Sequence, residues 1–242
     1  MAASATLAGI LLSGPVAMLL VGVTYPQPVW LGAEAFAAAH HPVQTLPYWF
    51  GFLLDGGSVA LIAALHAMAP PDLKARTGAA LAFAAAFAAL IFFNYAMQTS
   101  FVPVLAEEYS AAKAPVISAL TMANPRSLAW ALEMWGYALL GVATWLVAPV
   151  FSGGRLERAT AWLFVANGPV SIAGGFWTAA QPGWVMSPLG LSMFAGWNVL
   201  MFAMVVLALV CFRKRAAALV APPQDPPQAA RRAARPVTAV GA

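Results

Sequence analysis

The chain has 242 residues, of which 62% are hydrophobic and only 8% are charged, and its formal net charge is +4. A soluble domain carries charge on about 25% of its residues, so this composition excludes a water-soluble globular protein and indicates an integral membrane protein. The single cysteine, Cys211, excludes an intrachain disulfide and a cysteine-ligated zinc site. No stretch interleaves basic and aromatic residues as a polynucleotide-binding surface would, so we expect no nucleic-acid partner.

The apolar residues fall in continuous runs of the length that an α-helix needs to cross a bilayer, about 20 residues. Continuous runs favour helices over the alternating pattern of a membrane β-barrel. We predict an all-α fold of six transmembrane helices, paired as three hairpins in one domain over residues 1–215. The predicted spans are residues 5–25, 46–69, 78–101, 127–149, 159–180 and 188–212. The first lacks a basic segment before it, which favours a retained span over a signal peptide.

Basic residues gather in the loops on one side of these spans. Only Lys113 and Arg126 fall on the other side. The basic residues after spans two, four and six are Lys74, Arg76, Arg155, Arg158, Arg213, Lys214, Arg215, Arg231, Arg232 and Arg235. The positive-inside rule then places both termini in the cytoplasm. The bias towards alanine, proline and arginine is typical of a bacterial protein of high genomic GC content, so the expected location is the cell (cytoplasmic) membrane, with the lipid bilayer as partner.

The loops predicted to lie outside differ in kind from the basic ones. Residues 29–45 and 102–125 are long enough for short helices at the membrane interface. We therefore expect any entrance for a ligand on the outer face. The segment 216–242 is rich in proline, alanine and arginine, and it is predicted to be a disordered basic cytoplasmic tail.

A partial internal repeat runs through the predicted hairpins. Residues 14–16 and 168–170 both read Gly-Pro-Val, and a Gln-Pro pair begins thirteen residues after each of these glycines. The second helix of each hairpin also carries one carboxyl or amide side chain, namely Asp55, Glu133 or Asn198. The pattern indicates a threefold parallel repeat, an arrangement that transporters use to form sites near the membrane midplane. Chance spacing in an alanine-rich chain is the alternative explanation, and no family resemblance follows.

Two carboxylates inside the spans, Asp55 and Glu133, are the strongest candidates for function, because ionisable groups at this depth are costly. No span contains lysine or arginine that would neutralise them. We interpret both as protonatable ligand-binding groups. Four amide side chains in the spans are further candidate ligand-binding residues: Asn94, Gln98, Asn167 and Asn198. The alternative is that these amides only bond neighbouring helices, at about 0.6 kcal/mol each.

Nothing in the sequence specifies a reaction. We find no metal-ligand spacing, cofactor motif or nucleophile–base arrangement, so we predict no catalytic residue, metal or cofactor, and the enzyme question stays open. The first hypothesis is a small-solute binding or transport protein that recognises a small cationic or apolar ligand, or a proton-linked solute. The second is an intramembrane enzyme of the isomerase or cyclase type, in which an acid protonates a lipid-like substrate. The third is a non-catalytic membrane subunit or regulator.

Overall fold

A computed structural model of the protein describes residues 1–220, and within this range the chain is helical and contains no strand. The α-helices are α1 (Ala2–Leu11), α2 (Ala17–Thr24), α3 (Ala33–Ala39), α4 (Leu46–Met68), α5 (Lys74–Ala96), α6 (Val102–Glu107), α7 (Ala114–Leu120), α8 (Leu128–Val147), α9 (Arg155–Ala180) and α10 (Pro188–Val220). Short π or 3-10 turns are η1 (Leu12–Val16), η2 (Pro42–Thr45), η3 (Pro71–Leu73), η4 (Met97–Phe101), η5 (Ala148–Val150) and η6 (Trp184–Met186).

Five helical segments in the described range are long and apolar enough to cross a membrane, which confirms an α-helical membrane protein. They are Ala2–Thr24, Pro42–Met68, Pro71–Glu107, Leu128–Val150 and Pro188–Leu219. The remaining long helix, α9, has 26 residues, but its sequence is less apolar because polar residues such as Asn167 and Ser171 interrupt it. The length and hydropathy of the helices therefore support five of the six predicted spans.

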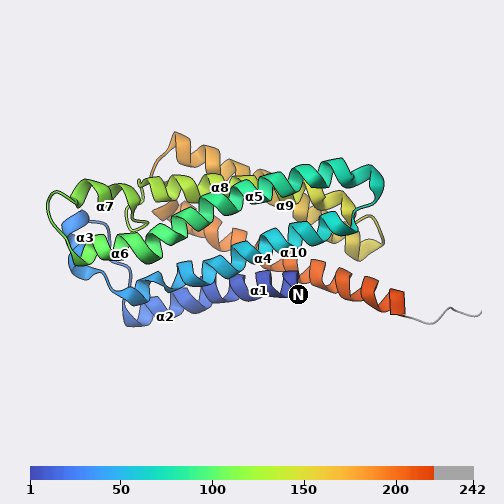
Figure 1. Cartoon of the computed structure of the whole chain (residues 1–242), viewed down its shortest axis with the longest axis horizontal. Coiled ribbons are helices and arrows are strands. Elements are labelled where there is room, and N and C mark those ends of the chain that lie inside the picture. The colour runs from blue at the N-terminus through green and yellow to red at the C-terminus, as the bar shows by residue number, and fades with distance from the viewer. Residues whose placement is uncertain (221–242) are drawn as a thin grey trace, which may run out of the picture. The chain divides into compact units, whose positions relative to one another are not determined.

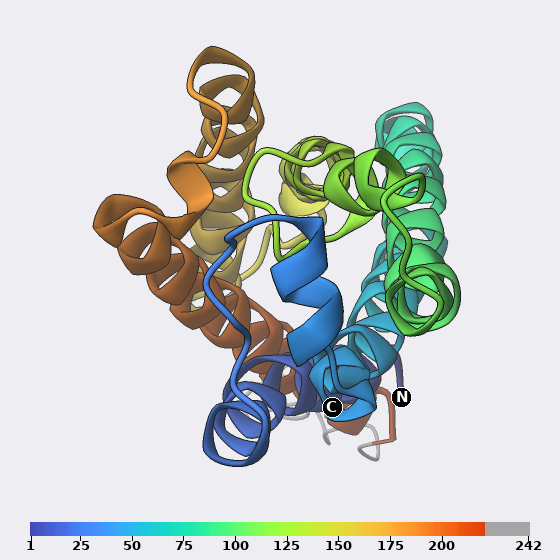
Figure 2. The same cartoon turned by 90° about the vertical axis from the view of Figure 1, so that its left-hand side faces the viewer.

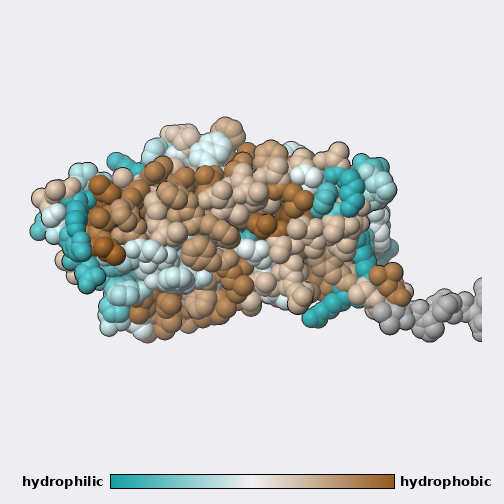
Figure 3. Space-filling model, in the orientation of Figure 1, coloured by the Kyte–Doolittle hydropathy of each residue, from teal (hydrophilic) through white to brown (hydrophobic). Residues whose placement is uncertain are grey.

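Consecutive long helices pack side by side: α1 on α4, α4 on α5, α5 on α8, and α8 on α9 (Figure 1). The part of α10 up to Cys211 belongs to the same compact unit. In the view of Figure 3 the side of this unit is largely hydrophobic, with hydrophilic residues towards both ends. Large apolar side chains on this outer surface include Leu19, Val23, Phe93, Trp162, Phe176 and Val199. This distribution suits a protein whose sides contact hydrocarbon.

The two Gly-Pro-Val segments of the predicted repeat adopt different local structures. Residues 14–16 lie in the π-helical turn η1, where Pro15 interrupts the regular hydrogen bonding between α1 and α2. Residues 168–170 lie within the continuous helix α9 despite Pro169. A proline thus marks a change of helix type in one segment and is absorbed in the other. The threefold repeat stays a prediction.

Two basic residues at one end of the bundle bond the last turns of neighbouring helices. The Lys74 ammonium donates to the carbonyl oxygens of His66 (2.6 Å) and Ala67 (3.1 Å) at the end of α4. The Arg76 guanidinium donates to the carbonyl of Leu146 (3.0 Å) near the end of α8. Cations are favourable at helix C-termini, where carbonyl groups lack intrahelical partners. These residues therefore stabilise the helix ends.

At the opposite end, the two long loops fold into a helical cap formed by α3, α6 and α7 (Figure 1). Figure 2 looks onto this end and shows α3 in the middle of the view, in front of the long helices. The cap has a small hydrophobic core of its own, made of Ala33, Phe36, Val102, Ala106 and Ile117. The loops predicted to form interfacial helices therefore do form helices, and they pack on one another.

His40, at the end of α3, makes the cap sensitive to pH. Both of its ring nitrogens are buried without a hydrogen-bond partner in the described range, and its ring packs 5.3 Å from that of Phe36. Burial, together with the neighbouring His41, lowers the pKa of His40 below its ordinary value of 6.5. The unfolded cap therefore binds protons more readily than the folded one. The contribution of neutral His40 to the stability of the cap is therefore fully present above about pH 6.5 and is lost as the pH falls from there through the lower pKa of the folded state.

We expect hydrogen exchange of the α3 amides to accelerate between about pH 8 and about pH 5, after correction for intrinsic exchange rates. The variant His40→Leu removes the titrating group and should abolish this acceleration. Replacing His66, which bonds Thr77 at the other end of the bundle, is the matched control and should leave it intact. An identical pH dependence in His40→Leu would show that another group is responsible.

The final helix continues further than the sequence predicted. Helix α10 runs to Val220, so that residues 216–220 extend the last helix where a disordered tail was expected to begin. The three alanines at 216–218 explain the extension, because alanine is the best helix former. The rest of the predicted tail, residues 221–242, lies outside the described residues.

Candidate functional site

Asp55 and Glu133 are joined by a chain of hydrogen bonds through two tyrosines. The Tyr137 hydroxyl donates to Asp55 Oδ1 (3.2 Å), and the Tyr95 hydroxyl donates to Glu133 Oε1 (2.9 Å). The two hydroxyl oxygens lie 3.4 Å apart, so a phenol that is not donating to its carboxyl group can donate to the other phenol. The order acid, phenol, phenol, acid is therefore unbroken. We call these four residues the acid–tyrosine relay.

Three helices bring the relay together. Asp55 lies on α4 and Tyr95 on α5, while Glu133 and Tyr137 lie four residues apart on α8 and so share one face of that helix. Gly51, one turn before Asp55, is the position over which the Tyr95 ring packs, and any Cβ there would overlap the ring. The glycine thus allows α5 to bring its phenol close to α4.

Two of the predicted amides extend the relay towards the cap. Asn94 donates to Glu133 Oε2 (3.0 Å), and Gln98 donates to Asn94 Oδ1 (3.3 Å). Gln98 also donates to the carbonyl of Leu120 (2.8 Å) and accepts from the backbone N–H of Met122 (3.1 Å). The amides therefore connect Glu133 to the segment that joins α7 and α8. We call Asn94 and Gln98 the amide arm.

At its other end the relay stops at an unpaired oxygen. Asp55 is 0% exposed, and its Oδ2 has no hydrogen-bond partner within residues 1–220. Neither Lys nor Arg occurs in α4, α8 or the apolar part of α5 beyond Arg76. Arg126, seven residues before Glu133 in the sequence, is exposed, and its side chain lies near Gly183. A buried carboxylate with a free oxygen and no cation is a site for a proton or a positively charged group.

Asn167 belongs to a second polar cluster between α8, α9 and α10. It donates to the Thr144 hydroxyl (3.0 Å) and accepts from the Trp197 indole N–H (3.1 Å). The Trp197 ring in turn packs edge-on against the Tyr137 ring, with centroids 4.8 Å apart. The cluster therefore touches the relay through aromatic rings without being hydrogen-bonded to it.

Asn198 is the predicted site residue that lies apart from both groups. Its amide donates to the carbonyl of Phe194 one turn earlier (2.9 Å), and its oxygen faces Gly14 of η1. This is the local bonding that polar residues in apolar helices commonly adopt. The structure thus places Asp55, Glu133, Asn94 and Gln98 in one network, Asn167 beside it, and Asn198 away from it.

Sequence reasoning missed the two tyrosines and Trp197. Tyr137 follows Glu133 by four residues, and this spacing alone places both on one helix face. Tyr95 is adjacent to Asn94, so its direction depends on how α5 is rotated against α4 and α8. That rotation is a tertiary property, which the local pattern does not contain.

Within residues 1–220 no three His, Cys, Asp or Glu side chains lie close enough to hold a metal ion together. Comparisons of the chain with protein-family models, with curated proteins and with solved structures find no match. Function is therefore inferred from the geometry of these residues alone.

Proposed function

We propose that the protein crosses the cytoplasmic membrane six times, with α9 as the sixth span and both termini in the cytoplasm. The 26 residues of α9 extend about 39 Å at 1.5 Å per residue, which exceeds the roughly 30 Å of the hydrocarbon core. The basic residues around Lys74 and Arg155 favour the cytoplasmic side for their end of the bundle. In this orientation the helical cap faces outward.

We further propose that the protein binds or transports a small cationic or proton-linked solute, with Asp55 and Glu133 as the protonatable groups. One observation carries this proposal: the two carboxyl groups share a continuous tyrosine relay that ends at the unpaired Oδ2 of Asp55. A relay of this kind can transmit the protonation of one acid to the other.

The number of protons available to the three contacts of the relay explains how protonation of one acid affects the other. When both acids are ionised, both phenols donate to carboxylates, and no proton remains for the contact between Tyr95 and Tyr137. When one proton is added, a protonated Asp55 can donate to Tyr137, Tyr137 to Tyr95, and Tyr95 to Glu133, so all three contacts become hydrogen bonds. The same chain runs in reverse when Glu133 holds the proton. The network therefore favours one shared proton, whose position responds to a cation near either acid.

Substitution of Asp55 by asparagine tests the proposal. Purified protein in liposomes that contain a pH indicator is challenged with alkali cations and with quaternary ammonium ions, which cannot cross as neutral bases. The wild-type protein should couple at least one of these cations to proton movement. Asp55→Asn keeps the side-chain volume but removes the ionisable group, so the proton signal should fall to that of empty liposomes.

Asp72→Asn is the matched control, because Asp72 is an exposed aspartate in the turn η3. It removes the same charge from the same chain and should retain the wild-type signal. Equal proton movement in wild type and Asp55→Asn, or none with any cation in the wild type, would overturn the proposed function.

The intramembrane enzyme remains a second candidate, favoured by the direct contact between a carboxyl and a phenol at Asp55 and Tyr137. Such a pair supplies a proton donor and a proton acceptor within one hydrogen bond. Incubation of purified protein with extracted membrane lipids should then produce a new chromatographic peak of unchanged mass, and both Asp55→Asn and Glu133→Gln should prevent it.

A further inference from the structure

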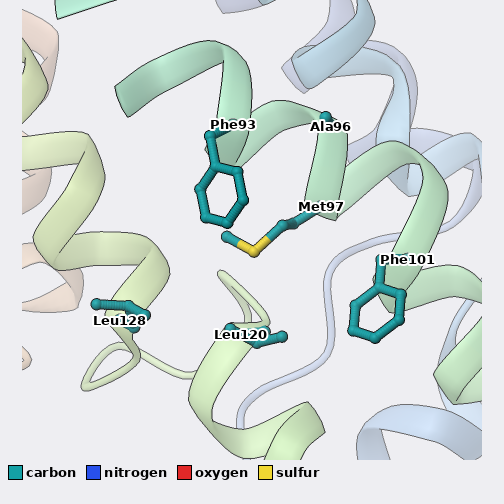
Figure 4. Close-up of a pocket in the computed structure, with 6 residues that line it drawn as sticks. All are labelled: Phe93, Ala96, Met97, Phe101, Leu120 and Leu128. Atoms are coloured by element: carbon teal, nitrogen blue, oxygen red, sulfur yellow. The ribbon is translucent and has the colours of Figure 1, made fainter. Parts of the chain in front are cut away.

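A shallow apolar groove of about 440 Å³ lies beside the amide arm, on the outer side of the bundle. Figure 4 shows its six lining residues, which come from α5, the turn η4, α7 and the start of α8: Phe93, Ala96, Met97, Phe101, Leu120 and Leu128. In that view the Phe93 ring and the Met97 thioether meet on one side, and the two leucines lie opposite them. The volume falls within the range of small-molecule sites, about 300–1,000 Å³.

The groove owes its shape to the π-helical turn η4, Met97–Phe101. A π-turn inserts an extra residue into a helix and is frequent at functional sites. Here it directs Gln98 inward, where the side chain is buried, and leaves Phe101 on the outer surface. The same turn therefore builds the amide arm on one side and the groove on the other.

The position of the groove determines what can occupy it. Phe93, Phe101 and Leu128 on its rim are 57%, 49% and 51% exposed, and all three belong to segments that cross the membrane. The hydrocarbon core of the bilayer surrounds segments of this kind over about 30 Å of their length, and no polar side chain lines the groove. A soluble or charged ligand would find no partner here. We propose that the groove binds one acyl chain of a phospholipid from the surrounding bilayer.

Binding of an acyl chain in the groove would act on the segment between α7 and α8. Leu120 lines the groove, and its carbonyl accepts the hydrogen bond from Gln98. Met97 lines it from the other side, directly before Gln98 in the sequence. An acyl chain in contact with both residues would hold together the two walls that Gln98 connects. This inference concerns lipid binding and does not depend on the proposed proton function.

The chain offers a matched control in a second surface groove on α9. Its lining residues are Ala173, Phe176, Trp177, Ala180 and Gln181. This groove is also open, but it contains a polar residue and has no π-turn behind it. Lipid that merely coats the protein should label both grooves alike, whereas a bound acyl chain should label the first one preferentially.

The test uses the full-length protein in bilayer nanodiscs that contain a phospholipid with a photoreactive diazirine in its acyl chain. After illumination, peptide mass spectrometry locates the adducts. We expect at least five-fold more adducts on residues 93–101 and 120–128 than on residues 173–181. Ala96→Leu fills the groove from an exposed helical position and should reduce its labelling to the level of the second groove, whereas Ala173→Leu should leave it unchanged.

Phe93→Ala, which removes part of the rim, gives an independent test should Ala96→Leu disturb folding, and it should also reduce the labelling. Uniform labelling of both grooves, or unchanged labelling in Ala96→Leu and Phe93→Ala, would overturn the proposal. Preferential labelling by a free diazirine fatty acid at equal concentration would overturn the assignment to a phospholipid chain.

Discussion

Replacing Gly57 by alanine is expected to destabilise the protein, although alanine is the better helix former. Gly57 lies on α4 where α1 crosses it, and a Cβ there would lie 2.6 Å from the backbone nitrogen of Thr6. Gly9 on α1 makes the reciprocal contact, because its added Cβ would overlap the backbone of Leu54. Small residues at such crossings let two membrane helices approach closely.

Two opposing contributions determine whether Gly57→Ala raises or lowers the free energy of unfolding. Exchanging glycine for alanine inside a helix contributes about 1 kcal/mol through propensity. Overpacking a close contact opposes folding by about 1–3 kcal/mol, and by more where backbone atoms must separate. Because the obstructing atom at Gly57 belongs to the backbone of Thr6, α1 has to move as a whole. The upper end of that range then applies, and after subtraction of the propensity gain we expect a net loss of about 2 kcal/mol in the free energy of unfolding.

The consequence reaches the relay, because Asp55 lies two residues before Gly57 and one after Leu54 on the same helix. Asp55 is fully buried, and its neighbours Leu54 and Gly57 are the residues of α4 that lie against α1. A shift of α4 relative to α1 should therefore disturb the placement of Asp55 in the relay, and the effect of Gly57→Ala on function should exceed its effect on helix content.

Thermal unfolding in detergent, followed by circular dichroism, measures the effect. Gly22→Ala in α2 and Gly196→Ala in α10 are matched controls, since a Cβ at either glycine meets nothing within 4 Å. Both controls should unfold at the wild-type temperature or higher. A Gly57→Ala protein as stable as these controls would show that α1 and α4 do not approach each other as described.

The sequence was most informative about ionisable residues whose burial in an apolar segment costs free energy. Asp55 and Glu133 stand out because carboxylates are rare in apolar runs, and the structure joins these two residues in one network. Asn94 and Gln98 were predicted as amide side chains within a span, and they extend the same network. Depth within a span and position on a helix face are local properties, which explains why these four residues could be identified.

The parts that were missed depend on how helices are rotated and combined. Tyr95 and Trp197 contribute to the site because α5 and α10 turn particular faces towards α8, and hydropathy does not record that choice. The cap is a similar case: the lengths of its loops predicted helices, but the packing of Phe36 against Ile117 brings together residues far apart in the sequence. Asn198 and Asn167 are both amide side chains within a predicted span. Only the tertiary contacts show that Asn167 lies beside the relay and Asn198 does not.

Replacing Tyr137 by phenylalanine is expected to uncouple the two acids while leaving both in place. The hydroxyl of Tyr137 is the link between Asp55 Oδ1 and the Tyr95 hydroxyl. Without it, Asp55 has no hydrogen-bond partner at either oxygen within the described residues. An unsatisfied buried polar group destabilises a protein by about 1–3 kcal/mol. Loss of a positioned proton-transfer group lowers a rate by about 10²–10⁴-fold, so the proton signal should fall by at least 100-fold.

Infrared difference spectroscopy distinguishes uncoupling from simple damage. The carbonyl stretch of a protonated carboxyl group reports each acid separately, and Asp55→Asn and Glu133→Gln assign the two bands. In the wild-type background, Glu133→Gln should shift the pH at which the Asp55 band appears, because the relay shares protons between the acids. In the Tyr137→Phe background the same substitution should shift that pH by less, because only the through-space interaction between the two charges remains. This comparison is a double-mutant cycle, which isolates the interaction between two sites from the separate effects of each change.

Tyr48→Phe is the matched control for this experiment. The Tyr48 ring packs 5.6 Å from that of Tyr95, but its hydroxyl is not part of the relay. It removes one phenol oxygen from the same region and should preserve both the coupling and the proton signal. If Glu133→Gln shifts the Asp55 band equally with and without the Tyr137 hydroxyl, the acids interact through space alone and the tyrosines have no part in moving the proton. A shift that is reduced only in Tyr137→Phe and Tyr95→Phe would instead assign proton sharing to the two phenols, which connect α4 to α8 through α5.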